Sequence, residues 1–218
     1  MSPTRLRRLL SSLSLSLLLA AVPAGLAWSA TAEEGRHYAL IDGGAPWQPA
    51  KPGRIEVAEV FAYWCGHCAR MQPQLDAWKA RQGKDVQLVY VPLPSGRDDA
   101  FARGFFAVQA AGATAKVHGR LFDAVHKAQA VPKNPSIAEL AAWYGQQGLD
   151  AKRLAAAMQA PALADRLAAA RQFAIRSGVE GTPTLIVDGR YRILGNSLAE
   201  LLQNTDTVIA HVRATRRR

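Results

Sequence analysis

The chain has 218 residues and a formal net charge of +10 at pH 7, and a chain of this length can bury one good core, with or without a modest inserted subdomain. Much of the positive charge lies in a C-terminal run, for which a solvated tail is expected, formed by Arg213, Arg216, Arg217 and Arg218. No clustered pattern of basic and aromatic residues accompanies this charge, so nucleic-acid binding is excluded as a function.

Residues 1–32 have the pattern of a secretory signal peptide. Three arginines within the first eight residues precede an apolar run over residues 9–24, and small residues that include Ala30 and Ala32 follow it. A transmembrane anchor is the alternative, but the apolar run is diluted by serine and shorter than the ~20 residues that a spanning helix needs. We therefore expect cleavage and export to the periplasm.

The next segment predicts a β-α-β unit. Residues 54–62 are rich in Ile, Val and Phe, which predicts a buried strand that delivers Trp64 and Cys65 at its C-terminal end. The following apolar residues have helical spacing, so a helix is expected to begin near Cys65 and to bend at Pro73. Residues 86–91 predict a second apolar strand.

Residues 98–171 are rich in alanine and have almost no β-branched runs, which predicts several helices. Ser136 and Glu139 have the spacing of a capping box, Asp150 can cap the next helix, and Pro161 separates that helix from another. Heptads are not sustained, so a compact helical bundle is favoured over a coiled coil.

After the helical block the pattern returns to strands. Residues 184–187 and 190–194 flank the dipeptide Asp188-Gly189, which is a strong signal for a two-residue hairpin. Ser197 then has the position of an N-cap for a final helix. The predicted order of elements is βαβ, helices, ββα.

The most informative residues are Cys65 and Cys68, the only cysteines in the chain. When a C-x-x-C pair opens a helix, the N-terminal N–H groups and the macrodipole favour a thiolate at the first sulfur. A disulfide that closes so short a loop would add little to the stability of the fold, which indicates that the pair serves redox turnover. Zinc is the alternative, but the histidines lack finger-like spacing, so we expect no metal and assign a role to His67 alone.

Two motifs and the order of elements resemble the thioredoxin fold. They are Trp64-Cys65-Gly66-His67-Cys68 and, before a predicted strand, Thr182-Pro183. The helical block between the two halves is similar to the insertion of the DsbA family of periplasmic disulfide oxidases. The resemblance covers essentially the whole mature chain.

The resemblance implies an α/β thioredoxin fold whose βαβ and ββα halves are interrupted by an inserted α-helical domain. The expected divisions are residues 1–32 for the signal peptide, 33–97 and 172–218 for the two halves, and 98–171 for the insertion. The implied function is a thiol:disulfide oxidoreductase, without a bound cofactor, that donates its disulfide to unfolded or reduced exported proteins. A membrane oxidase of the DsbB type would reoxidise it, and a monomer is expected.

The resemblance also implies roles for individual residues. By the family's pattern, Cys65 is the nucleophile, Cys68 is the buried resolving partner, and Pro183 is a cis-proline that faces the disulfide. The backbone of Thr182 could pair with an extended substrate by strand addition. His67, when cationic or donating a hydrogen bond, would stabilise the Cys65 thiolate.

Two residues depart from the commonest DsbA pattern. Gly66 stands where those proteins usually carry proline, which gives the motif more typical of protein disulfide isomerases, and Thr182 before the cis-proline is also isomerase-like. Both positions influence the reduction potential of the pair. A periplasmic reductase or isomerase is therefore an alternative, and a chaperone-like peptide-binding protein is an alternative of a different class.

Glu59 lies on the first predicted strand and matches a buried acid of the family. A buried carboxyl group could relay a proton to Cys68, with its pKa raised by desolvation. The alternative is that either Glu56 or Glu59 faces solvent through strand alternation. Tyr63 and Trp64 could serve either packing or the substrate surface.

Overall fold

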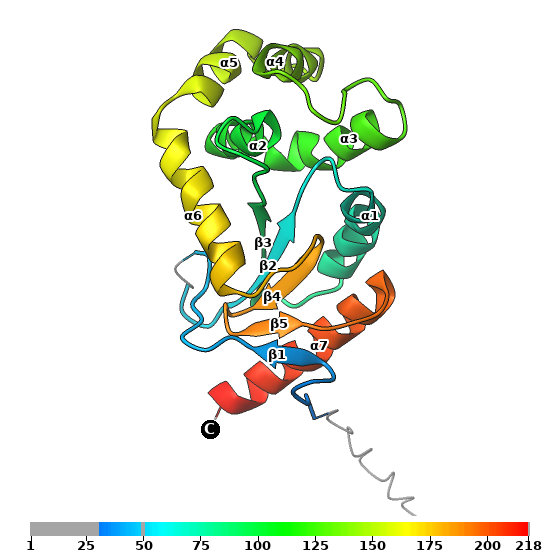
Figure 1. Cartoon of the computed structure of the whole chain (residues 1–218). Helices are drawn as coiled ribbons and strands as arrows, with labels where there is room; N and C mark the ends of the chain where they lie inside the picture. The colour runs from blue at the N-terminus through cyan, green and yellow to red at the C-terminus, as the bar shows by residue number, and fades with distance from the viewer. Residues whose placement is uncertain (1–30, 49–50, 218) are drawn as a thin grey trace, which may run out of the picture.

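The structure is a computed structural model that describes residues 31–48 and 51–217 (Figure 1). All but the last two residues of the predicted signal peptide lie outside the described residues. Within the described ranges, no helix is both long enough and apolar enough to cross a bilayer.

The centre of the fold is a five-stranded sheet in the order β1-β5-β4-β2-β3. Its strands are β1 (Tyr38–Leu40), β2 (Ile55–Phe61), β3 (Val86–Pro92), β4 (Thr184–Val187) and β5 (Tyr191–Ile193). β2 and β3 are parallel and are joined by α1 (Gly66–Ala80), while the other neighbours are antiparallel. Helix α1 runs through Pro73, and a bend at that residue stays a prediction.

Five helices are inserted between β3 and β4. They are α2 (Ala100–Ala110), α3 (Thr114–His126), α4 (Ile137–Gln146), α5 (Ala151–Gln159) and α6 (Ala162–Arg176). In Figure 1, α2 to α5 lie beyond the ends of β2 and β3, and α6 returns alongside the sheet. The predicted α/β thioredoxin fold with an inserted helical region is confirmed. Residue 171 lies inside α6, and the division of the chain at residues 98 and 171 stays a prediction.

Local end signals of the helices are where the sequence predicts them. Ser136 and Glu139 form a reciprocal capping box at the start of α4, and Asp150 accepts the backbone N–H of Arg153 at the start of α5. Ser197 caps α7 (Leu198–Arg216), the final helix. These caps satisfy backbone donors that would otherwise lack intrahelical partners.

The hairpin between β4 and β5 is also confirmed. Asp188 and Gly189 have φ angles of 51° and 66°, and the N–H of Arg190 donates to the carbonyl of Val187 over 3.0 Å. Two consecutive positive φ angles are those of the turn that matches strand twist. A Cβ atom on Gly189 would collide with the backbone of Ala45, so the turn requires glycine there.

Strand β1 was missed by the sequence prediction, which placed the first strand at residue 54. β1 is three residues long and lies at the edge of the sheet, where Tyr38 pairs with Ile193. The ring of Tyr38 packs edge-on against that of Tyr191, with centroids 5.0 Å apart. So short a strand shows no period of two in sequence.

The expectation of a solvated C-terminal tail is wrong for two of its arginines. Arg213 forms a two-pronged ion pair with Asp85, over 2.7 and 3.0 Å, and Arg216 pairs with Asp188 over 2.6 Å. Their partners are distant in sequence but close in space, because α7 extends to Arg216 and brings these arginines against the start of β2 and the β4–β5 turn. A charge run read locally cannot reveal such partners.

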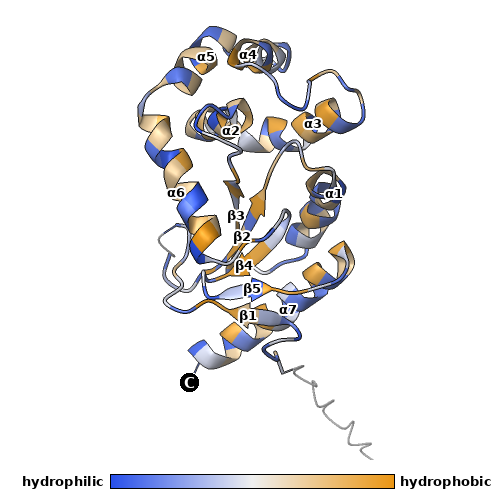
Figure 2. Cartoon of the chain, viewed as in Figure 1, coloured by the Kyte–Doolittle hydropathy of each residue, from blue (hydrophilic) through white to orange (hydrophobic). Residues whose placement is uncertain are grey.

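Hydrophobic side chains pack on both faces of the sheet, and every residue of β2 is buried. Figure 2 shows hydrophobic residues along the central strands and mixed residues along the helices that cover them. Phe105 and Phe106 of α2 are buried, as the sequence predicts. A strand buried on both faces is rigid, and β2 therefore places the residues that follow it reproducibly.

Candidate active site

The C-x-x-C motif lies where strand β2 gives way to helix α1. Cys65 is the N-cap of α1, with φ −81° and ψ 116°, and its sulfur accepts the backbone N–H of Cys68 over 3.5 Å. Both cysteines are free thiols, so the structure describes the reduced form. A sulfur at a helix N-terminus lies at the positive end of the macrodipole.

The environment of Cys65 favours its thiolate. Hydrogen bonds from the Cys68 thiol, from the Thr182 side chain and from the backbone N–H groups of Cys68 and His67 lower the pKa of Cys65 from 9.0 to about 5, although burial opposes this. The side chain is 8% exposed, so the sulfur lies just beneath the surface. A thiolate at neutral pH is the reactive form of cysteine.

Cys68 has the opposite character. Its side chain is 0% exposed. The hydrogen bond to Cys65, burial and the nearby charge of Glu59 all raise the pKa of Cys68 far above its ordinary value. The two cysteines therefore differ in the charge that their surroundings favour, and their roles as nucleophile and resolving partner stay predictions.

The loop before β4 reaches the cysteine pair from the other side. The Thr182–Pro183 peptide bond is cis, as expected. The sulfur of Cys65 lies 3.2 Å from the carbonyl oxygen of Thr182, to which the thiol form donates. Thr182 and Pro183 are both partly exposed.

Trp64 and the two residues between the cysteines are exposed or half-buried. The ring Nδ1 of His67 accepts from Arg70 over 2.9 Å, so the contact of His67 with the Cys65 sulfur is through its backbone N–H. A Cβ atom on Gly66 would meet only the end of the Arg70 side chain, at 3.8 Å, so space does not require glycine there. Trp64 is 39% exposed beside the motif, whereas Tyr63 is buried.

Glu59 is buried beneath the motif, as the resemblance implies. It is 0% exposed, and neither carboxyl oxygen has a hydrogen-bond partner among the described residues. Burial, together with the negative charges of Asp76 and Cys65, raises the pKa of Glu59 from 4.5 to about 8. The group is therefore mostly protonated at neutral pH and can exchange a proton.

Neither glutamate of β2 faces solvent, so the expectation from strand alternation is wrong. Glu56 is 2% exposed, and its carboxylate accepts the backbone N–H groups of Trp47 and Gln48 over 2.7 and 2.9 Å. The loop that carries these donors covers the face of the sheet that alternation would leave open. Glu56 therefore holds a loop, while Glu59 has no such partner.

Two histidines for which the sequence predicts no role lie within hydrogen-bond distance of Tyr63, two residues before Cys65. His118 of α3 is buried, with its Nδ1 2.6 Å from the Tyr63 hydroxyl, and burial lowers the pKa of His118 to about 3. His126, eight residues further along α3, lies 2.8 Å from the Tyr63 carbonyl oxygen through its Nε2. Helix α3 of the inserted region thus contacts both the side chain and the backbone of Tyr63. No sequence spacing signals contacts across more than fifty residues.

Comparison with known proteins agrees with this geometry. The family model of the DSBA-like thioredoxin domain matches residues 56–205. The thiol:disulfide interchange protein DsbA of Burkholderia cepacia is 30% identical over 215 residues, which cover 95% of this chain and 98% of that protein. The chain belongs to the DsbA family. It is therefore a thiol:disulfide oxidoreductase whose redox pair is Cys65 and Cys68.

Solved structures of the DsbA family match most of the chain. The oxidoreductase DsbA from Xylella fastidiosa has a TM-score of 0.79 and 38% identity, and the match covers 84% of this chain and 98% of that one. DsbA of Pseudomonas aeruginosa has a TM-score of 0.75 and 28% identity, over 84% of this chain and 96% of that one. The inserted helices are thus part of the shared fold.

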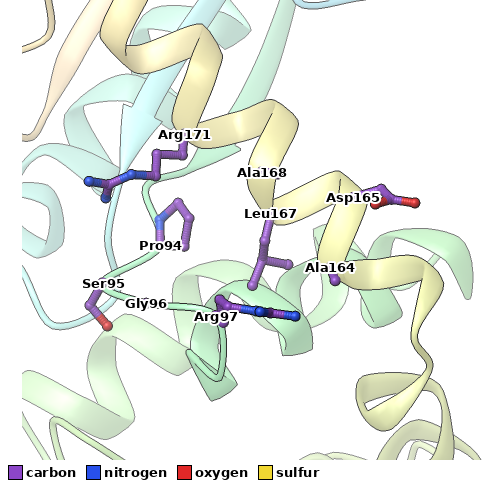
Figure 3. Close-up of a pocket in the computed structure, with 9 residues that line it drawn as sticks. All are labelled: Pro94, Ser95, Gly96, Arg97, Ala164, Asp165, Leu167, Ala168 and Arg171. Carbon is purple, nitrogen blue, oxygen red and sulfur yellow. The ribbon is translucent and has the colours of Figure 1, made fainter.

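A cavity of about 540 Å³ lies between the β3–α2 loop and α6 (Figure 3). The guanidinium groups of Arg97 and Arg171 at its rim point away from one another. None of its lining residues belongs to the C-x-x-C motif or to the loop of Pro183. Its polar groups do not converge, so we do not include it in the DsbA-type active site. No cluster of three or more potential metal ligands is found in the part of the chain that the structure describes.

Proposed function

We propose that the protein is a disulfide oxidase that transfers its Cys65–Cys68 disulfide to newly exported proteins. The observation that carries this proposal is the contrast between the two sulfurs. Lowering the pKa of Cys65 to about 5 stabilises the reduced form, because the thiolate gains hydrogen bonds that a disulfide cannot accept as well. A pair whose reduced form is stabilised is a stronger oxidant.

The proposed transfer has two steps. A substrate thiolate attacks the Cys65 sulfur and forms a mixed disulfide, while the Cys65–Cys68 bond breaks and Cys68 leaves with the electron pair. A second substrate thiolate then attacks the substrate sulfur of the mixed disulfide and expels Cys65 as a thiolate. The substrate dithiol is oxidised, and the protein is left with one thiolate and one thiol.

We assign proton transfer at Cys68 to Glu59. The leaving Cys68 sulfur must take a proton because its pKa is raised, and Glu59 is buried nearby with a pKa of about 8. A protonated carboxyl group can donate at neutral pH and recover a proton later. The backbone of Thr182 would pair with the extended substrate beside the reacting sulfurs.

Three expected partners and places belong to this proposal. The substrates are unfolded or reduced exported proteins, reoxidation is by a DsbB-type membrane oxidase, and the location is the periplasm. The predicted signal peptide over residues 1–32 supports export. Intact-mass measurement of the exported protein tests it: loss of about 27 to 32 residues is expected, and retention of the whole N-terminus in the membrane fraction would contradict it.

An isomerase or reductase is the second candidate, favoured by Gly66 and Thr182. The equilibrium of the pair with a glutathione buffer separates the two. An oxidase is expected to have a potential above about −180 mV, the value typical of protein disulfide isomerase. A potential near about −270 mV, typical of thioredoxin, would overturn the oxidase assignment.

A chaperone-like protein that uses its cysteines only incidentally would behave differently. The Cys65→Ser variant of an oxidase is expected to lose catalysed disulfide formation in a reduced, unfolded substrate. If the variant promotes recovery of native substrate as well as the wild type does, peptide binding rather than redox exchange is the activity.

A further inference from the structure

A groove of about 550 Å³ lies directly beside the C-x-x-C motif. It is bounded by the start of α1, the loop before β4, and the segment between β5 and α7, three parts of the chain that lie on the same side in Figure 1, at the ends of the central strands. His67 and Thr182 are among its lining residues. A chain bound to the Thr182 backbone would therefore extend along or over this groove.

The groove carries two guanidinium groups without ion-pair partners. Arg70 projects from α1 and Arg192 from β5, and within residues 31–48 and 51–217 neither forms a salt bridge. Glu180 is the one acidic residue among the described residues that line the groove. The local charge is therefore positive.

Both arginines are positioned by neighbouring residues. Nη2 of Arg70 lies 2.9 Å from the His67 ring, at the mouth of the groove. Arg192 is half-buried and lies beside Gly178, where a Cβ atom would be 3.4 Å from its Nε, in ordinary van der Waals contact. Arginines held by neighbours lose less conformational entropy when they bind an anion than free surface side chains do.

The geometry of an extended substrate places a side chain at this groove. In a strand, residues two apart point to the same face and lie about 6–7 Å from one another. When a substrate cysteine points to Cys65, the residue two positions away also points to the protein. On the side of the groove, that residue faces the lining to which Arg70 and Arg192 contribute.

We infer that Arg70 and Arg192 select substrate segments that carry an acidic residue close to the reacting cysteine. A carboxylate can accept paired hydrogen bonds from a guanidinium group, and the positive groove attracts such a segment before contact. A lysine at the same position meets like charge. This inference rests on the proposed exchange with exported proteins and adds a preference among them.

The test measures the rates at which the oxidised protein oxidises three two-cysteine peptides. The peptides carry Glu, Ser or Lys two residues before and two residues after the attacking cysteine. The Glu-to-Lys rate ratio in the wild type is compared with that in an Arg70→Ser/Arg192→Ser double variant. Dividing the two ratios cancels the effect of the flanking charges on the peptide thiol itself.

The double variant is expected to lower the Glu-to-Lys ratio about fivefold to tenfold at low salt, and the difference should shrink as salt is added. The matched control is Arg97→Ser/Arg171→Ser, which removes the same charge at the cavity of Figure 3 and should keep the wild-type ratio. An Arg70→Lys/Arg192→Lys variant, which preserves the charge, should retain most of the preference.

Three outcomes overturn the inference. One is an unchanged ratio in the Arg70→Ser/Arg192→Ser variant, and another is an equal loss in the control, which would show a response to net charge alone. If the Ser-flanked peptide is oxidised in either case, the proposed function stands and only the substrate preference fails. If none of the three peptides is oxidised, both fail.

Discussion

The contrast between the two cysteines predicts how the stability of the protein changes with redox state and pH. At pH 7 the reduced form is expected to be at least about as stable as the oxidised form, and at pH 4 it should be the less stable of the two. The Cys65 thiolate stabilises the reduced form alone, because that charge is absent once the disulfide forms.

The size of the effect follows from the pKa of Cys65, about 5 in the folded state against about 8.5 in an unfolded chain. Because the folded value is the lower one, the thiolate's contribution is complete above about pH 8.5 and is lost as the pH falls through about 5. At pH 7 it amounts to at most about 2.7 kcal/mol, and less where water screens the sulfur. At pH 4 almost none remains.

The disulfide stabilises the oxidised form in a different way. Closing a loop of four residues restricts the unfolded chain and contributes about 2 kcal/mol by loop entropy, with no dependence on pH. The thiolate is therefore expected to match or slightly exceed it at pH 7 and to fall below it at pH 4. The difference in unfolding free energy between the two forms should shift by about 1–3 kcal/mol over this range.

The assay is urea or thermal unfolding of the oxidised protein and of protein kept reduced by a phosphine, between pH 4 and pH 7. A shift of 1 kcal/mol corresponds to about 2–4 °C in melting temperature for a chain of this size. The Cys65→Ser variant, which has neither thiolate nor disulfide, supplies the pH dependence of all other groups. A redox difference that does not vary with pH would refute the thiolate mechanism. An oxidised form more stable by about 2 kcal/mol or more at pH 7, which is the loop entropy with no thiolate contribution, would favour a reductant.

Three further predictions concern the motif and the strand beneath it. Cys68→Ser is expected to accumulate mixed disulfides with substrate proteins on non-reducing gels. Its Cys65 thiolate can attack a disulfide of a substrate and expel one substrate thiolate, and the intramolecular resolver is gone. Cys65→Ser should show few mixed disulfides, and the reverse pattern would mean that the two roles are exchanged. Glu59→Gln is expected to raise the free energy of unfolding at pH 7 by up to about 3 kcal/mol and to give no gain at pH 4. The pKa of Glu59 is about 8 in the folded state, so its carboxyl opposes folding increasingly as the pH rises above the lower pKa of the unfolded chain. Equal gains at both pH values in thermal melts would contradict this. Gly66→Pro is expected to fold and to raise the free energy of unfolding, measured in urea, by about 0.4–1 kcal/mol. Position 66 is the first residue of α1, and Cys65 already has the extended backbone that precedes proline. A loss of stability would show that the backbone there does not accommodate proline.

Much of the fold could be predicted because its signals are local. The Asp188-Gly189 turn and the box of Ser136 and Glu139 depend on backbone angles and donors within four residues, and both are as expected. The C-x-x-C motif is largely local too, since the Cys68 thiol and the backbone N–H groups at the start of α1, which lower the pKa of Cys65, lie within three residues of it. Signals of this kind can be recognised from the sequence because all the residues involved are neighbours in the chain.

What could not be predicted depends on residues that only the fold brings together. His118 contacts Tyr63, fifty-five positions away, and Arg213 contacts Asp85 across 128 positions. Arg192 reaches the active-site groove from β5, for which the sequence predicts only a strand of a hairpin. Neither charge runs nor periodicity contains this information, because it arises from packing between elements.

The burial of Cys68 sets a kinetic competition within the mixed disulfide. Once a substrate is attached to Cys65, burial still raises the pKa of Cys68 and keeps it a neutral thiol, and thiols attack disulfides slowly. The backward route, in which Cys68 expels the substrate, is therefore delayed, and the substrate's own second cysteine has time to arrive. Proteins whose two cysteines meet early in folding should leave with a disulfide, while those whose cysteines stay apart should be returned unchanged. The burial of Cys68 is therefore expected to favour the oxidation of substrates whose two cysteines come together quickly.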